Sequence, residues 1–167
     1  MTLNIPGADH LDRALGFVSA IPLALIVALT FSDVFARYFF ASPIPGAAEM
    51  IQFSMAITIF AALPLVTRAG GHITVDFFSY ALSPNKRVYL QLPCELISGI
   101  ALALISWRLW TQAVEHAQNN TMTLVLRLPM APLAYLMAGF AALAVVAVGL
   151  RFIATLRTAF APPETTP

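Results

Sequence analysis

The sequence contains little of what catalytic and metal-binding proteins commonly use. Its one cysteine, Cys94, excludes an intramolecular disulfide and any cysteine-based zinc cluster. Only 10% of the 167 residues are charged, and the nine basic and eight acidic residues form no basic stripe that would bind nucleic acid. The chain also lacks an HExxH motif, a glycine-rich phosphate loop and a serine nucleophile elbow. We therefore expect a protein that is not an enzyme and has no nucleic-acid partner.

Hydrophobic residues, by contrast, make up 59% of the chain, and the mean hydropathy is +0.81. A helix needs about 20 apolar residues to cross a hydrocarbon core about 30 Å thick. Four segments meet this requirement: 14–32, with a helix able to continue to 40, then 47–67, 88–112 and 131–156. The composition predicts an all-α membrane protein in which residues 1–167 form a single membrane domain with four transmembrane helices.

The basic residues predict the orientation of these spans. Cytoplasmic connections carry an excess of lysine and arginine. One side of the membrane would hold Arg13, Arg68, Lys86, Arg87, Arg151 and Arg157, and the other only Arg37 and Arg127, with Arg108 near the end of the third span. Both termini are therefore expected in the cytoplasm. Two aspartates precede the first span and no clear cleavage site follows it, so we interpret it as a retained helix rather than a signal peptide.

The connection between the second and third spans, RAGGHITVDFFSYALSPNKR at residues 68–87, is the longest central stretch that is not simply apolar. His72 and Asp76 lie four residues apart, which suggests a catalytic pair at first sight. On a helix, however, they share one narrow polar stripe with Ser79 and Ser83, opposite a broad apolar face. The pattern predicts a short amphipathic helix over about residues 72–82 in the cytoplasmic interface. The candidate residues of this segment are Arg68, Gly71, His72, Asp76 and Phe77.

A second group of polar candidates lies at the outer ends of the first two spans. Asp33 and Arg37 are four residues apart and can pair on a continuing helix. Glu49 lies in the first turn of the second span, where a carboxylate complements the helix dipole, and it could also reach Arg37. An interfacial cluster of ion pairs is the favoured interpretation, and a substrate site is the alternative.

A third polar group enters the bilayer on the third span. Glu95 lies about two helical turns, roughly 12 Å, beyond Arg87, and Gln91 precedes it by one turn on the same face. An intramembrane carboxylate is a functional candidate by default. At this shallow depth a structural role, with Gln91, water or a neighbouring helix as partner, is the simpler interpretation.

Two spans also carry stripes of small residues. Positions four apart hold Gly16, Ala20, Ala24, Ala28 and Ser32 in the first span, and Ala134, Ala138 and Ala142 in the fourth. Small side chains allow close approach of membrane helices. We expect these stripes to pack within a four-helix bundle, and contact with another membrane subunit is the alternative.

Histidine positions argue against a bound haem. Ligation across a bundle needs two imidazoles that face each other from membrane spans. His10, His72 and His116 all fall outside the apolar cores. We therefore expect no cofactor.

The order of the motifs resembles a known family. DVFARYFFASPIPGAAEM is followed by one span, then RAGGHITVD, then a span that ends near tryptophan, then TMTLVLRLPMAPLAYLMAGFAAL. Over about residues 33–151 this resembles the small permease subunit of tripartite ATP-independent periplasmic (TRAP) transporters, the DctQ-like family. The chain departs from that pattern in GAAE at 46–49, where the family often has an aromatic and two acidic residues, and in Arg127, which enters a usually uncharged stretch.

The resemblance implies one part of a three-part importer in the bacterial inner membrane. A periplasmic binding protein captures an organic acid, a large permease carries the substrate and sodium sites, and the small subunit is its scaffold. By the same resemblance, Arg37 and Glu49 lie near the outer surface that faces the binding protein, and His72 and Asp76 lie on the cytoplasmic side. Two alternatives stay open: a haem or quinone anchor of a redox enzyme, and a self-contained small transporter with Glu95 as its coupling carboxylate.

Overall fold

Four long α-helices make up the described part of the protein. A computed structural model describes residues 8–69 and 84–160, with side chains over 13–67 and 92–157. The helices are α1 (Ala8–Phe40), α2 (Ala47–Ala69), α4 (Pro84–Gln118) and α5 (Met130–Phe160). Each contains a segment long and apolar enough to cross a membrane. The expected four-span, all-helical class is thus confirmed, whereas the interfacial helix expected over 72–82 lies outside the described residues.

The helices overlap the four expected spans and extend beyond them. The first helix, α1, continues without a break to Phe40, the later of the two C-terminal ends that the sequence allowed for it. The helix of the third span, α4, begins at Pro84, where the fixed φ of proline suits a first helical turn, and continues to Gln118. The membrane-crossing parts are Arg13–Phe40, Ala47–Thr67, Leu92–Gln118 and Met130–Arg157.

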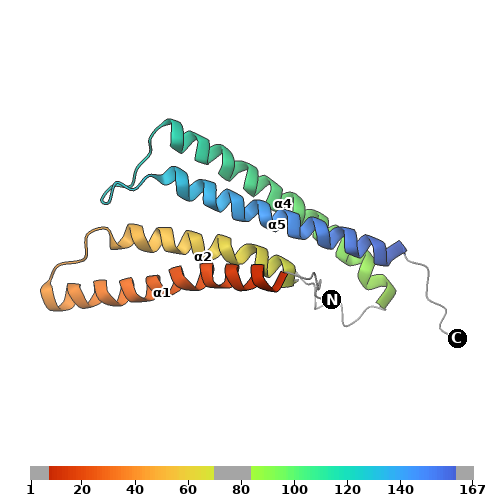
Figure 1. Ribbon diagram of the computed structural model, residues 1–167, viewed down its shortest axis with the longest axis horizontal. Helices are drawn as coiled ribbons and strands as arrows, with labels where there is room; N and C mark the ends of the chain where they lie inside the picture. Colours follow the sequence, from red (N-terminus) through yellow and green to blue (C-terminus); the bar gives the residue numbers. More distant parts are fainter. Residues whose placement is uncertain (1–7, 70–83, 161–167) are drawn as a thin grey trace.

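The helices form two antiparallel hairpins that lie side by side (Figure 1). One hairpin is α1 with α2, the other is α4 with α5, and α2 packs against α5. The order across the molecule is therefore α1, α2, α5, α4, with α1 and α4 outermost. The start of α1 and the end of α5 lie at the same end, here called the terminal side (Figure 1). The opposite end, where α1 leads to α2 and α4 leads to α5, is called the loop side.

Small side chains occupy the contact between the hairpins. Ala61 of α2 and Ala141 and Ala144 of α5 are fully buried. Leu102 of α4 and Val148 of α5 complete the core, with Leu63 and Val145 packed against it. Because alanines let helices approach closely, these residues allow tight packing where the hairpins meet.

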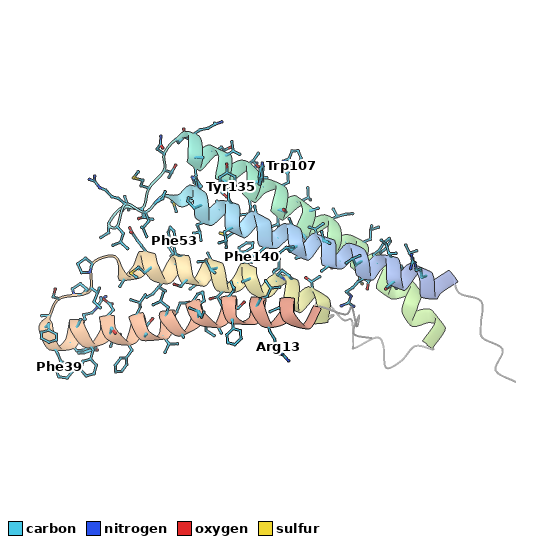
Figure 2. All side chains as sticks on the ribbon, viewed as in Figure 1. Arg13, Phe39, Phe53, Trp107, Tyr135 and Phe140 are labelled. Carbon is cyan, nitrogen blue, oxygen red and sulfur yellow. The ribbon has the colours of Figure 1, made fainter. Side chains whose placement is uncertain are left out.

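Aromatic side chains lie both between the hairpins and at their margins. Figure 2 shows Phe53 of α2 and Phe140 of α5 between the two hairpins, whereas Phe39 stands at the far end of α1. Trp110 and Tyr135 meet edge to face, with 5.3 Å between ring centroids, and join α4 to α5 near the loop side. Such pairs add to the stability given by burial alone.

The two stripes of small residues have different surroundings. In α5, Ala134 and Ala138 are buried, whereas Ala142, the third residue of the stripe, is exposed. The Ala138 carbonyl accepts a hydrogen bond from the Ser106 hydroxyl of α4 at 3.3 Å. In α1, the stripe residues Ala20, Ala24, Ala28 and Ser32 are exposed, and no atom lies within 4 Å of a Cβ built on Gly16. The expectation that the α1 stripe packs within a bundle was therefore wrong, because α1 turns a different face, with Leu15 and Ser19, toward α2. Lipid or another membrane subunit is left to cover the stripe.

Candidate functional site

Glu49 joins the two hairpins at the loop side. It lies in the first turn of α2, and its carboxylate reaches the connection between α4 and α5. Oε1 accepts the backbone N–H of Val125 at 2.8 Å, and Oε2 accepts that of Leu126 at 2.9 Å. Hydrogen bonds to an ionised acceptor are about twice as strong as neutral ones. We call this contact of Glu49 with Val125 and Leu126 the loop-side clasp.

Gly46 makes room for the clasp. It precedes α2 with a φ of 79°, a left-handed conformation that glycine adopts without strain. A Cβ at this position would lie 2.5 Å from Cγ of Leu126, too close for any real contact. Leu126 therefore sits directly over a site that only glycine leaves open.

The partner loop has internal hydrogen bonds of its own. The Thr123 N–H donates to the Leu128 carbonyl at 2.9 Å, and the Leu128 N–H donates to the Thr123 hydroxyl at 3.0 Å. Met122 and Pro129 form a β-bridge beside them, and Arg127 has a φ of 52°. These contacts close a small turn and leave the N–H groups of Val125 and Leu126 available to Glu49.

Asp33 organises the connection between α1 and α2. Its Oδ2 pairs with Nη2 of Arg37 at 2.8 Å, which confirms the pair predicted from their spacing. Its Oδ1 accepts the backbone N–H of Ile44 at 2.9 Å and so holds the chain that leads into α2. The predicted reach of Glu49 to Arg37 is not what the structure shows, because both oxygens of Glu49 face backbone donors of the other hairpin.

Arg151 joins three helices at the terminal side. Its Nη1 donates to the carbonyl oxygen of Thr67, in the last turns of α2, at 2.9 Å. Its Nη2 lies 3.7 Å from Oε1 of Glu95 on α4, and the Thr155 hydroxyl donates to the same oxygen at 3.3 Å. The last carbonyls of a helix lack intrahelical donors and carry partial negative charge, so they favour a cation. We call the contact of Arg151 with Thr67 and Glu95 the terminal-side clasp.

Glu95 thus has a neighbouring helix, α5, as its partner, which is one of the possibilities considered from the sequence, but Arg151 itself was not identified as that partner. Arg151 entered the sequence interpretation only as a charge that sets orientation. The available signal was local: Arg151 and Thr155 lie four residues apart and share one face of α5. Oε2 of Glu95 is buried and accepts no hydrogen bond from the residues that the structure describes. Gln91 lies one turn earlier in α4, but its side chain is outside the described part, so the predicted pairing stays a prediction.

The candidates expected on the cytoplasmic side lie largely outside the described residues. Arg68 belongs to α2, but its side chain is outside the described part of the chain. Gly71, His72, Asp76 and Phe77 fall between the described ranges. Their assignment to an interfacial segment remains a prediction.

The described polar groups serve contacts between helices rather than an evident reaction centre. Within residues 8–69 and 84–160, no three histidine, cysteine or acidic residues gather where they could hold a metal ion. A groove of about 620 Å³ between α4 and α5 has no titratable side chain in its lining, which includes Ser106, Trp107, Trp110 and Val146. What the geometry provides is one polar clasp at each end of the α2–α5 contact. Both clasps oppose separation of the hairpins.

A known protein family matches the part of the chain that contains both clasps. The family described as "Tripartite ATP-independent periplasmic transporters, DctQ component" matches residues 26–158. A relative in Haemophilus influenzae, "Putative TRAP transporter small permease protein", is 29% identical over 100 residues. That alignment covers 60% of this chain and 61% of the relative, so the chain spans about three fifths of the relative's length.

Proposed function

The chain belongs to the DctQ family of tripartite ATP-independent periplasmic transporters, and from this we propose that it is the small membrane subunit that scaffolds a large permease. In this proposal the complex imports an organic acid together with sodium, and a periplasmic binding protein delivers the acid. The small subunit contributes a single membrane domain and no catalytic group.

The pair of clasps is the observation that best supports a scaffold. Glu49 binds the opposite hairpin at one end of α2, and Arg151 binds the other end of the same helix. A subunit fixed at both ends resists sliding or hinging between its halves. In many transporters one body moves against another during alternating access, and a rigid small subunit suits the static side of such a motion. A self-contained carrier would instead need two halves free to move.

The two polar surfaces have separate roles in this proposal. The loop-side group of Asp33, Arg37 and Glu49 lies near the face turned toward the binding protein, and the exposed Arg37 guanidinium is its most accessible charge. The segment from Arg68 to Phe77 lies at the cytoplasmic surface. Gln91 and Glu95 support the helix packing from within.

Four membrane helices and the family together describe a multi-pass protein of the bacterial inner membrane. We further propose that the terminal side faces the cytoplasm, because it carries the larger share of arginine and lysine. The loop side, with both clasped loops, then faces the periplasm.

Single cysteines should report this orientation. In a Cys94→Ser background, Ser83→Cys and Asn119→Cys place one thiol on each side of the proposed membrane. An impermeant maleimide added outside intact cells should label position 119 and leave position 83 unlabelled until the cells are opened. Labelling of position 83 in intact cells would invert the orientation.

The scaffold role predicts a specific companion in the native membrane. When the tagged subunit is purified in a mild detergent, a large multi-span permease should be the main co-purifying membrane protein, identified by mass spectrometry. In liposomes, the subunit alone should give no sodium-driven uptake of organic acids, whereas the complex with the binding protein should. Uptake by the subunit alone, or its purification without a large permease, would contradict the proposal.

A further inference from the structure

The tip of the loop between α4 and α5 exposes an unusual amount of apolar surface. Leu124 is 95% exposed, Val125 58% and Met122 53%. These residues lie outside the membrane-crossing segments, which end at Gln118 and resume at Met130. Apolar side chains in contact with water are unfavourable in proportion to their exposed area. The tip therefore needs a non-aqueous contact that the described chain does not supply.

The exposure belongs to a defined conformation. The Thr123–Leu128 hydrogen bonds and the Met122–Pro129 bridge close the turn. Glu49 holds two consecutive N–H groups of the tip. The side chain of Leu124 consequently projects from a braced turn.

The clasp also sets the depth of the tip relative to the bilayer. The apolar part of α2, Ala47–Thr67, has 21 residues. At 1.5 Å per residue it is about 31 Å long, close to the thickness of a hydrocarbon core of about 30 Å. Its first turn, which contains Glu49, therefore lies at the edge of that core. Because Val125 and Leu126 bind Glu49 directly, the tip lies at the same depth; Figure 1 shows the loop folded back toward the start of α2.

Arg127 adds a charge that suits this position. It is exposed, and it follows the apolar residues of the tip within the same turn. An arginine at the edge of the core can place its guanidinium among lipid headgroups while nearby apolar side chains enter the acyl region. The tip thus combines the two chemical features of an interfacial anchor.

We propose that residues 122–127 anchor the loop side of the protein in the lipid interface. Leu124 and Val125 enter the boundary between headgroups and acyl chains, and Arg127 lies against lipid phosphate. The inference does not depend on the proposed scaffold function. A protein partner could also cover an apolar tip, but the depth set by Glu49 favours lipid, which surrounds the four spans at that level.

A fluorescent label at the tip would test the anchor. In the full chain with Cys94→Ser, bimane is attached to Leu124→Cys, and the protein is reconstituted in phosphatidylcholine vesicles with or without acyl chains brominated close to the headgroup. Bromine quenches bimane only on close contact. We expect several-fold stronger quenching at position 124 than at Asn119→Cys, an exposed position in the turn directly after α4.

Leu104→Cys, on the exposed face of α4 within its span, serves as the lipid-contact control. Its label should be quenched more strongly in vesicles whose acyl chains are brominated deep in the bilayer than in vesicles brominated close to the headgroup. Equal, weak quenching at positions 124 and 119 would overturn the anchor. A label at 124 that stays unquenched in lipid and shifts in emission only when a co-purified membrane protein is present would also overturn it, in favour of a protein contact.

Discussion

Replacing Arg151 with alanine should destabilise the protein by about 2–3 kcal/mol, somewhat below the loss typical of breaking a fully buried ion pair. The change leaves the Thr67 carbonyl without its guanidinium donor and leaves the carboxylate of Glu95 without its cation. We place the loss below the fully buried case because Arg151 keeps 26% of its side chain exposed, whereas Glu95 keeps 15%. Reversible unfolding in mixed micelles, followed by circular dichroism, measures the effect.

A double variant gives the sharper result. The stability lost in Arg151→Ala should come mainly from the Glu95 carboxylate, which is left without a cation. Glu95→Gln should then recover part of that stability, so that the double variant is more stable than Arg151→Ala alone. Arg157→Ala is the matched control, because Arg157 is an exposed arginine later on the same helix, and it should change little. Additive losses in the double variant would show that Arg151 and Glu95, which pair within the α4–α5 hairpin, are not coupled. Equal losses at 151 and 157 would show that the bond from Arg151 to the Thr67 carbonyl does not hold the hairpins together.

Gly46→Ala should destabilise the protein by about 2–5 kcal/mol. A residue with a Cβ at positive φ loses about 1–2 kcal/mol, and crowding a packed site adds about 1–3 kcal/mol. Both terms apply here, since Gly46 has a φ of 79° and its new Cβ would lie 2.5 Å from Cγ of Leu126. The loop between α4 and α5 would have to move away from position 46. Limited proteolysis should therefore cut residues 121–129 faster than in the parent protein.

Two further variants separate the steric effect from a general loss of glycine. Gly16→Ala and Gly139→Ala lie inside helices with no atom within 4 Å of the new Cβ, so they should be neutral or stabilising by up to about 1 kcal/mol. Leu126→Ala in the Gly46→Ala background should restore the part of the stability lost to crowding. If Gly46→Ala matched Gly16→Ala, Leu126 would not be seated over Gly46 in the membrane.

Only contacts between residues close in the sequence could be predicted from the sequence for the candidate site. Asp33 and Arg37 could be paired from the sequence because a spacing of four places two side chains on one helical face. Glu49 could be assigned to the first turn of a helix, but its acceptor role could not be foreseen, since its donors lie 76 and 77 positions away. The contact of Arg151 with Glu95 was hidden for the same reason. Neither spacing nor composition states which helices are neighbours.

The sequence by itself determined the membrane character, the four spans and the family resemblance, because each depends on hydropathy and on short motifs read along the chain. Only the tertiary structure decided which faces meet. Of the two similar stripes of small residues, the one on α5 is buried at Ala134 and Ala138, whereas Ala20, Ala24, Ala28 and Ser32 on α1 are exposed. In water an apolar face indicates a buried one, but in a bilayer lipid tails are as apolar as leucine, so hydropathy does not distinguish a helix contact from a lipid contact. Two polar side chains among these apolar helices, Glu49 and Arg151, reveal which helices are neighbours. Each forms hydrogen bonds to the opposite hairpin and so holds the two hairpins against each other.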